Sequence, residues 1–381
     1  MVFPGAEHSR FGHALGAMAL MHNALTSLSE KGTDISQDEH EAALAVALLH
    51  DVGHGPYSHT LEHELLSDFQ HEMMSRALLE RLNRRMNGRL EMAIAMFDDT
   101  YPRRWFHQLI SSQLDMDRLD YLRRDSYYTG VAEGAIGVGR IIKTLRVHPN
   151  DGSDEDRIVV EAKGAYAIEN YLIARRLMYW QVYLHKTVIA GDQVLRSVIR
   201  RVRYWLEQEA DELVAGASEP FLYFLRKGFS GLDVHEPDVQ DAFVALDDAD
   251  ILFSLKRWTN SSDPILADLS RRFLERDFFR VDYQVESERL APQALEDSVA
   301  SLLLDAGLST PEHIARDLSF YILRAQSTHE AYDIREDVIA VMNRAGRIEE
   351  LSVTEDVMVI EPLAEQQVRP YVCYPKEAFA P

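Results

Sequence analysis

The stretch that decides the fold of this chain is His50-Asp51-Val52-Gly53-His54-Gly55-Pro56-Tyr57-Ser58-His59. It follows an apolar run, Ala42 to Leu49, which predicts a buried helix. Such a helix delivers His50 and Asp51 at its C-terminal end, where an imidazole nitrogen and a carboxylate oxygen can face one point. The glycines and the proline that follow predict a tight turn with room for a ligand beside the backbone. The His-Asp pair therefore predicts a site for a divalent metal ion of intermediate hardness.

Two other parts of the chain offer ligands of the same kinds. Four side chains from three predicted helices form the candidate metal site: His13, His50, Asp51 and Asp117. Any one of them alone is better explained as a hydrogen-bonded core histidine or a helix-capping aspartate. As a set they predict mixed nitrogen and oxygen ligation with positions left open for water and a phosphate oxygen. One divalent ion is expected; Mn, Fe or Ni suits this ligation, and Zn or Mg is tolerated.

The order and context of these residues resemble the HD-domain phosphohydrolases. Within them, the most similar branch is that of the deoxynucleoside-triphosphate triphosphohydrolases, which includes dGTPase-like enzymes. The extended string is specific, whereas a lone His-Asp pair would be weak. The resemblance implies a mostly α fold, with an HD-domain helical core and a small α+β C-terminal part. The matching stretches span roughly the first half of the chain: Phe3–Gly16, His50–His59, Asp117–Asp125 and, more weakly, Arg175 with Tyr183–Lys186.

The resemblance also assigns catalytic roles. His71 matches the position of a catalytic histidine, and Glu62 matches an acidic residue that orients it. A histidine held by a carboxylate can act as a general acid, because its pKa lies near neutrality. His54 and His59 match positions of polyphosphate contact and proton transfer. Without the resemblance, His71 would be interpreted as a surface residue of an amphipathic helix, and His63 is a local competitor.

One predicted helix carries several polar side chains whose spacing places them on a single face: Asp117, Asp120, Tyr121, Arg124 and Asp125. Because Asp117 is a proposed metal ligand, this face is predicted to be the wall of a polar cavity rather than a solvated surface. By resemblance, Arg118 contacts phosphate, while Tyr121 and Asp125 hold the sugar.

A second group of candidate substrate contacts follows later in the chain. Arg175 and Lys186 lie eleven residues apart, so they nearly coincide in angle on a straight helix. The family pattern places phosphate contact on Arg175 and base or sugar packing on Tyr183, with His185 nearby. The alternative for Tyr183 is ordinary aromatic packing. The predicted substrate-binding residues are Arg10, Arg118, Tyr121, Asp125, Arg175, Tyr183, His185 and Lys186.

The composition excludes several classes of protein. Among 381 residues, 40 Lys and Arg stand against 62 Asp and Glu, which gives a net charge of −22. Such a surface repels a nucleic-acid backbone, so no broad nucleic-acid binding is expected, and basic residues near the motifs favour a polyphosphate ligand. No apolar run reaches membrane length, the first residues lack the basic and apolar regions typical of a signal peptide, and the single cysteine, Cys373, excludes an internal disulfide. We expect a cytoplasmic homo-oligomer with a nucleotide substrate and no membrane partner.

The organisation of the chain is predicted as three regions: a catalytic HD-domain helical core at 1–210, a helical extension at 211–330 and a small β-containing region at 331–381. The long helical stretch from Ala165 to Glu209 is expected to bend near Gly191-Asp192. In the tail, alternating apolar residues predict strands at Val353–Ile360 and Val368–Tyr374.

The predicted function is metal-dependent hydrolysis of deoxynucleoside triphosphates, dGTP or several dNTPs, to deoxynucleoside and triphosphate. The alternatives are an HD-type phosphohydrolase of nucleoside monophosphates or cyclic nucleotides, and a non-enzymatic nucleotide sensor. Family members carry an upstream segment with a Gln-Leu pair that reads the sugar 3′-hydroxyl and crowds out a 2′-hydroxyl. The given sequence begins after that segment, so either the true N-terminus lies upstream of Met1, which we expect, or this protein discriminates sugars by other means.

Overall fold

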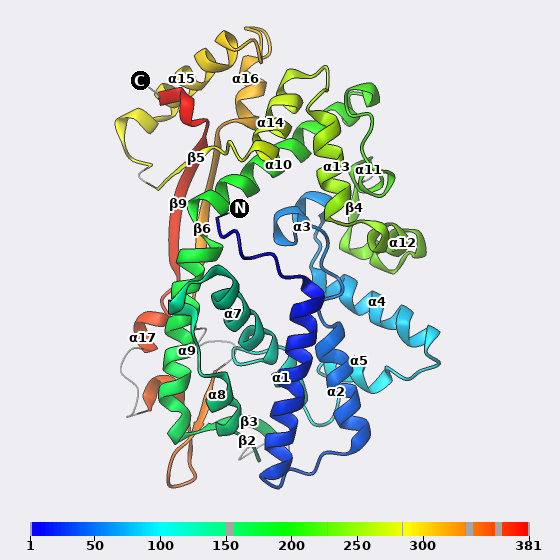
Figure 1. Cartoon of the computed structure of the whole chain (residues 1–381), viewed down its shortest axis with the longest axis vertical. Helices are drawn as coiled ribbons and strands as arrows, with labels where there is room; N and C mark the ends of the chain where they lie inside the picture. Colours follow the sequence, from blue (N-terminus) through cyan, green and yellow to red (C-terminus); the bar gives the residue numbers. More distant parts are fainter. Residues whose placement is uncertain are drawn as a thin grey trace.

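The computed structural model describes residues 2–149, 156–226, 228–283, 285–332, 338–354 and 360–379. The fold is mostly helical with small sheets, as the sequence predicts (Figure 1). The α-helices are α1 (Arg10–Glu30), α2 (Gln37–Leu49), α3 (His59–Leu65), α4 (His71–Arg85), α5 (Glu91–Phe97), α6 (Trp105–Ile110), α7 (Met116–Thr129), α8 (Val138–Thr144), α9 (Ala165–Met178), α10 (Lys186–Glu207), α11 (Glu219–Arg226), α12 (Pro237–Ala245), α13 (Asp248–Trp258), α14 (Pro264–Glu275), α15 (Pro292–Asp305), α16 (Ile314–Asp317) and α17 (Ile360–Leu363). The strands are β1 (Leu66–Ser67), β2 (Leu145–Pro149), β3 (Asp156–Glu161), β4 (Phe229–Ser230), β5 (Arg280–Asp282), β6 (Leu323–His329), β7 (Ala340–Met342), β8 (Ile348–Glu350) and β9 (Gln367–Tyr374).

Helices α1, α2 and α7 pack together and carry the predicted metal ligands (Figure 1). Side chains fix where each helix begins. The Ser9 hydroxyl accepts from an amide in the first turn of α1, Ser36 and Glu39 form a reciprocal capping box on α2, and Asp115 caps α7. Each cap satisfies amides that a helix start would otherwise leave without partners. The caps therefore set the register that places the site residues along these helices.

Close contact between α1 and α7 depends on Gly16. A Cβ at this position would lie 2.1 Å from Oδ1 of Asp120 and 2.3 Å from Nη2 of Arg124. Any side chain would push the two helices apart, because such distances are far below van der Waals contact. The glycine thus permits the approach on which the site is built.

The long helical stretch from Ala165 onward is interrupted at Tyr179–Tyr183, which forms a π-helical turn between α9 and α10. The predicted bend near Gly191-Asp192 is wrong, since both residues lie inside α10. A π turn accommodates an extra residue without glycine or proline, so composition does not reveal it.

Because of this interruption, Arg175 and Lys186 do not lie on one straight helix. Arg175 belongs to α9, and Lys186 is the first residue of α10, after the π turn. His185 precedes α10 as its N-cap, where Nδ1 accepts from the amide of Thr187 at 3.1 Å. A straight-helix projection therefore does not apply across this segment.

The sheets are small and join distant parts of the chain. One has the strand order β2-β3-β7-β8 and another the order β5-β9-β6. The antiparallel β6–β9 pairing runs from Leu323 opposite Cys373 to His329 opposite Gln367, and it confirms the predicted strand at Val368–Tyr374. The predicted strand at Val353–Ile360 is wrong at both described ends, because Val353 ends a 3-10 turn and Ile360 begins α17; residues 355–359 lie outside the described part.

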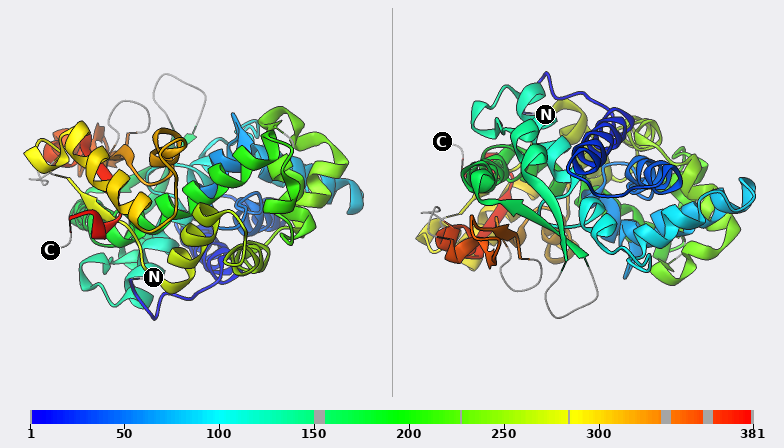
Figure 2. Two further views of the ribbon diagram at one scale, coloured as in Figure 1. Left: turned by 90° about the horizontal axis from the view of Figure 1, so that it is seen from above. Right: turned by 90° about the horizontal axis from the view of Figure 1, so that it is seen from below.

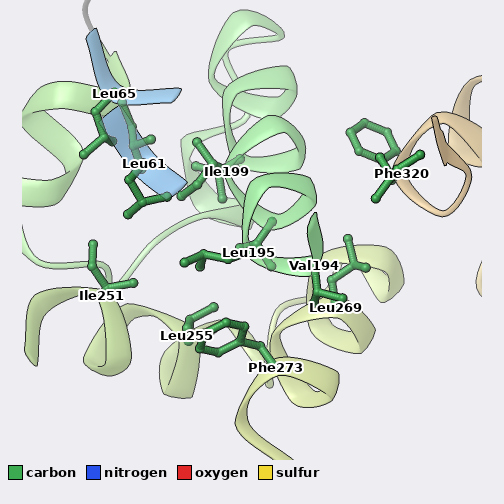
Figure 3. Close-up of a cluster of buried hydrophobic side chains, with 14 of the residues drawn as sticks. Leu61, Leu65, Val194, Leu195, Ile199, Ile251, Leu255, Leu269, Phe273 and Phe320 are labelled. Atoms are coloured by element: carbon green, nitrogen blue, oxygen red, sulfur yellow. The ribbon is translucent and has the colours of Figure 1, made fainter. Parts of the chain in front are cut away.

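Among the described residues, two large hydrophobic cores and a small third cluster (Leu79, Leu90 and Ile94) hold the fold together. The first core lies among α1, α2 and α6–α9, with Met21, Leu25, Leu119 and Leu172 at its centre. The second core lies around α10, whose side chains meet those of α13 and α14 (Figure 3). The labelled members from these three helices are Val194, Leu195, Ile199, Ile251, Leu255, Leu269 and Phe273.

The C-terminal residues divide between the two cores. Ala331, Val341 and Leu363 belong to the first core, whereas Val372 and Tyr374 of β9 belong to the second. Seen from above and from below, the C-terminal segments lie on one side of the molecule and α4 on the other (Figure 2). The division at residues 210 and 330 stays a prediction. Among the described residues, no helix has the length and apolar character needed to cross a membrane.

Candidate metal centre and catalytic cavity

Four side chains from α1, the end of α2 and the first turn of α7 meet at one point. Each of His13, His50, Asp51 and Asp117 offers a ligand atom within 4.8 Å of the others. Nε2 of His13 lies 2.8 Å from Oδ1 of Asp117, and Nε2 of His50 lies 3.6 Å from the same oxygen. The structure thus brings together the full set of predicted metal ligands.

Both imidazoles are held from behind, so that Nε2 faces the centre. Nδ1 of His13 lies 2.8 Å from Oδ2 of the fully buried Asp120, and Nδ1 of His50 lies 3.0 Å from the carbonyl oxygen of Ala47. A ring that donates through Nδ1 keeps the lone pair on Nε2 for a metal ion. Nε2 of His50 is buried without a hydrogen-bond partner among the described residues. The donor set and this nitrogen fit a divalent ion.

The pKa values of the ligands also fit a bound divalent cation. Burial lowers the pKa of His13, but the carboxylates of Asp117 and Asp120 more than offset this effect and raise the pKa to about 9. Burial raises the pKa of Asp117, yet His13 and His50 hold it well below its usual range. In the metal-free protein a proton thus lies between an imidazole and a carboxylate. A divalent cation can replace it.

A second group of histidines adjoins the metal ligands. Nδ1 of His54 lies 3.3 Å from Oδ1 of Asp51, and its ring lies over that of His71 with centroids 3.7 Å apart. One carboxylate oxygen of Glu62 accepts a hydrogen bond from the backbone amide of His71 at 2.8 Å and lies 3.2 Å from Nδ1 of the His71 ring. Nε2 of His71 lies 3.2 Å from a carboxylate oxygen of the exposed Glu72. The predicted pairing of His71 with Glu62 is therefore present.

Two arginines line the space next to the metal ligands. Nη1 of Arg10 lies 3.2 Å from Oδ2 of Asp51, and its other nitrogens donate to the Ser58 hydroxyl. Nε of Arg118 donates to the buried Asp115 at 3.1 Å. Burial raises the pKa of Asp115 to about 6, with Arg118 acting in the opposite direction.

The side chains surround a cavity of about 550 Å³. This volume lies within the range of sites that bind small molecules and cofactors. Its walls combine metal ligands, basic groups and aromatic rings: His8, Ser9, Arg10, His13, Asp51, His54, His71, Asp117, Arg118, Tyr121, Asp125, Tyr179 and Tyr183.

Away from the metal ligands, the cavity wall is aromatic. The hydroxyl of Tyr183 donates to Oδ2 of Asp125 at 2.7 Å, and Nε2 of His8 lies 2.9 Å from Oδ1 of the same carboxylate. Edge-to-face contacts join Tyr183 to Tyr121 and Tyr179, with centroids 6.1 and 5.0 Å apart. We call these five residues the aromatic end. Rings and hydrogen-bonding groups of this kind can hold a sugar and a base.

Three predicted substrate-binding residues do not line this cavity. Arg175 is buried; its Nη1 donates to the carbonyl oxygen of Ala331 at 3.0 Å, and its Nε has no hydrogen-bond partner among the described residues. His185 caps α10, and the exposed Lys186 lies over the ring of Tyr283 at 5.3 Å. His59 begins α3, but its side chain lies outside the described part of the chain.

Several residues of the site were not predicted from the sequence. Asp120 was placed on the cavity-facing side of its helix, but its contact with His13 was not foreseen. Its spacing of three from Asp117 was the available signal. Asp115, which pairs with Arg118, is a helix cap by sequence pattern. No local pattern distinguishes His8 or Tyr179 as cavity residues.

A helical bundle that gathers two histidines and two aspartates beside a basic and aromatic cavity defines a metal-binding phosphohydrolase. Comparison with known proteins gives the family. The family model described as HD domain matches residues 10–125, and that described as HD associated region matches residues 136–231. A phosphohydrolase from Bacteroides thetaiotaomicron has a crystal structure with 41% sequence identity and a TM-score of 0.88; the match covers 98% of this chain and 89% of that chain.

Curated relatives extend the comparison. The uncharacterized protein YwfO of Bacillus subtilis is 31% identical over 99% of this chain and 83% of its own length. The human deoxynucleoside triphosphate triphosphohydrolase SAMHD1 is 23% identical over 97% of this chain, which spans 64% of that protein. The chain belongs to the HD-domain phosphohydrolases.

Proposed function

We propose that the protein hydrolyses deoxynucleoside triphosphates to deoxynucleoside and inorganic triphosphate. The observation that carries this proposal is the composition of the cavity, whose metal ligands and arginines suit a polyphosphate and whose aromatic end suits a nucleoside. The similarity to SAMHD1, a deoxynucleoside triphosphate triphosphohydrolase, supports the same substrate class. The substrate is dGTP or several dNTPs.

The residues that would hold the divalent ion are His13, His50, Asp51 and Asp117. When bound there, such an ion neutralises charge on the phosphate and makes water a stronger nucleophile. Arg10 and Arg118 would hold the phosphate oxygens, because guanidinium groups form strong paired hydrogen bonds with them. Arg175, a buried cation, would contribute if it turned from the Ala331 carbonyl toward a bound triphosphate.

The bond that breaks joins the α-phosphorus to the 5′-oxygen of the sugar, and the water oxygen takes its place on phosphorus. The leaving 5′-oxygen needs a proton. His71 would supply it, oriented by Glu62 through Nδ1. His54 would contact the phosphate from its position beside Asp51 and His71. Tyr121, Asp125 and Tyr183 would hold the sugar.

Product identification tests the proposal directly. The metal-loaded protein is incubated with a panel of dNTPs, ribonucleotides, deoxynucleoside monophosphates and cyclic nucleotides, and the products are separated by ion exchange. Free triphosphate and deoxynucleoside from a dNTP are expected. Orthophosphate released from monophosphates, or opening of a cyclic nucleotide, would favour the alternative phosphohydrolase. Binding of nucleotides with no turnover would favour a sensor.

A further inference from the structure

The aromatic end of the cavity is backed by a histidine from the C-terminal sheet. His329, the last residue of β6, lies face to face with Tyr179; the ring centroids are 3.8 Å apart and the planes differ by 14°. The ring of Trp180 meets the same imidazole edge-on, with centroids 6.3 Å apart. His329 is only 6% exposed, so its contacts are with protein. It therefore fills the space behind Tyr179.

Tyr179 needs such support because of where it lies. It is the first residue of the π turn, whose backbone departs from the regular helical hydrogen-bonding pattern. One edge of its ring contacts Tyr183, which in turn holds Asp125. Its face stacks on His329, so the imidazole limits how far the tyrosine can swing away from the cavity.

The imidazole behaves here as a flat, uncharged ring. Burial, together with the nearby positive charges of Arg175 and Arg176, lowers the pKa of His329 to about 4. A neutral ring stacks on tyrosine without a desolvated charge to satisfy. Strand pairing holds it in place, because His329 lies opposite Gln367 in the β6–β9 ladder. Nearby on β9, the guanidinium of Arg369 lies 3.9 Å from the Trp180 ring centroid.

We propose that His329 is a positioning residue that holds Tyr179 against the nucleoside part of the substrate and thereby sets affinity and selectivity for the base. The inference rests on the proposed function in so far as the ligand of the aromatic end is a nucleoside. The C-terminal sheet thus contributes to substrate choice without touching the substrate. Stacking of a base on an aromatic side chain is sequence-tolerant by itself, so the orientation of the ring decides which bases fit.

The test separates binding of the nucleoside from binding of the phosphates. Affinities for deoxyguanosine, thymidine and inorganic triphosphate are measured by calorimetry on the metal-loaded wild type, His329→Ala, His329→Leu and His329→Phe. His329→Ala and His329→Leu should weaken deoxynucleoside binding about tenfold and leave triphosphate binding and metal content unchanged. His329→Phe restores an aromatic face and should recover most of the affinity. In turnover, KM should rise more than kcat falls, and the ratio between dNTPs should change.

The exposed His313, which precedes α16 and does not line the cavity, gives the control His313→Ala. His329→Leu fills the space without a ring, so it tests the stack even if His329→Ala unfolds. Unchanged deoxynucleoside affinity in His329→Leu would overturn the proposal, as would a loss of triphosphate binding equal to the loss of deoxynucleoside binding. Two further results would also overturn it: His329→Phe that does not recover the deoxynucleoside affinity, and wild-type protein that binds no nucleoside. The binding measurements need no turnover, so failure of the proposed reaction shows separately, as absence of triphosphate release by wild type.

Discussion

The metal ligands and the aromatic end of the same cavity are built in different ways. The ligands lie within or directly after helices with capped starts, and the two histidines donate through Nδ1 to the Asp120 carboxylate and the Ala47 carbonyl oxygen. The aromatic end draws on the N-terminal segment, α7 and a π turn, and His329 at the tip of β6 supports it from behind. The geometry of the aromatic end therefore depends on irregular backbone and on contacts between residues that are distant in the sequence.

This difference separates what is general to the reaction from what selects the substrate. A metal centre tolerates little displacement, since ligand geometry decides affinity, and regular helices provide the needed rigidity. A base-binding wall can vary by shifting one ring, which an irregular turn permits. Substitutions at the metal end should therefore affect all substrates alike, whereas those at the aromatic end should change their ranking.

The largest effect is expected for Asp51→Ala. The carboxylate is a proposed ligand and also faces Arg10 and His54, so its loss should remove both the metal ion and detectable turnover of every nucleotide. Elemental analysis beside a rate assay measures both. Asp305→Ala, an exposed acid at the end of α15, is the control. Full metal content in Asp51→Ala would rule out the assigned site.

A smaller loss is expected for His71→Ala, which should keep metal and nucleotide binding and lose about 10²–10⁴-fold in kcat, the usual contribution of a general acid. Glu62→Gln should lose less, because the histidine remains. Single-turnover kinetics and a binding assay on the same samples separate the loss of turnover from any loss of binding. Unaltered hydrolysis in His71→Ala would remove this residue from the mechanism, and a nucleotide sensor predicts no change at all.

An intermediate effect on binding is expected for Arg118→Ala. A charge-assisted hydrogen bond contributes ~1.5–3 kcal/mol, so affinity for a non-hydrolysable dGTP analogue and for inorganic triphosphate should fall by about tenfold or more. Affinity for deoxyguanosine should stay the same. Arg123→Ala, on the same helix but outside the cavity wall, should change neither. If dGMP binds wild type as tightly as the triphosphate analogue, a monophosphate substrate is the better interpretation.

A further effect, independent of any substrate, concerns the stability of the metal-free protein. The pKa of His13 is raised from 6.5 to about 9 in the fold, so its protonated form stabilises the native state fully below pH 6.5, and this stabilisation is lost as pH rises through about 9. The loss should be on the order of 3 kcal/mol. Urea unfolding of chelator-treated protein between pH 6 and 10 measures it. Asp120→Asn removes one cause of the shift and should flatten the dependence; identical slopes for both proteins would contradict the assignment.

Sequence alone predicts the metal end well because its information is local. The His-Asp pair ends a recognisable apolar helix, and Asp117 follows the helix cap Asp115. The caps of α1 and α2 are equally local: Ser9 and Ser36 belong to a residue type that favours helix starts, and Glu39, three positions after Ser36, completes a capping box. The mostly α fold follows from the same periodic patterns.

The aromatic end was less predictable because its geometry depends on the π turn. A glycine normally marks a weak point in a helix, but Gly191 is buried inside α10, and the actual interruption contains only large residues. An extra backbone residue per turn rotates everything after it, which changes where Arg175 and Lys186 lie relative to each other. Neither His8 nor His329 belongs to a local pattern that could link it to the cavity.

The division of the C-terminal segment between both cores bears on the order in which the protein can assemble. During synthesis the metal ligands emerge well before Ala331, Val341 and Leu363, which belong to the same core as residues of α1, α2 and α7. Until residues 331–363 are made, that core exposes apolar surface, a state that favours aggregation or chaperone binding. A growing chain is thus expected to complete its metal centre only after this segment has emerged, and a cut in the backbone before residue 331 would loosen the helices that hold the ligands without removing any ligand.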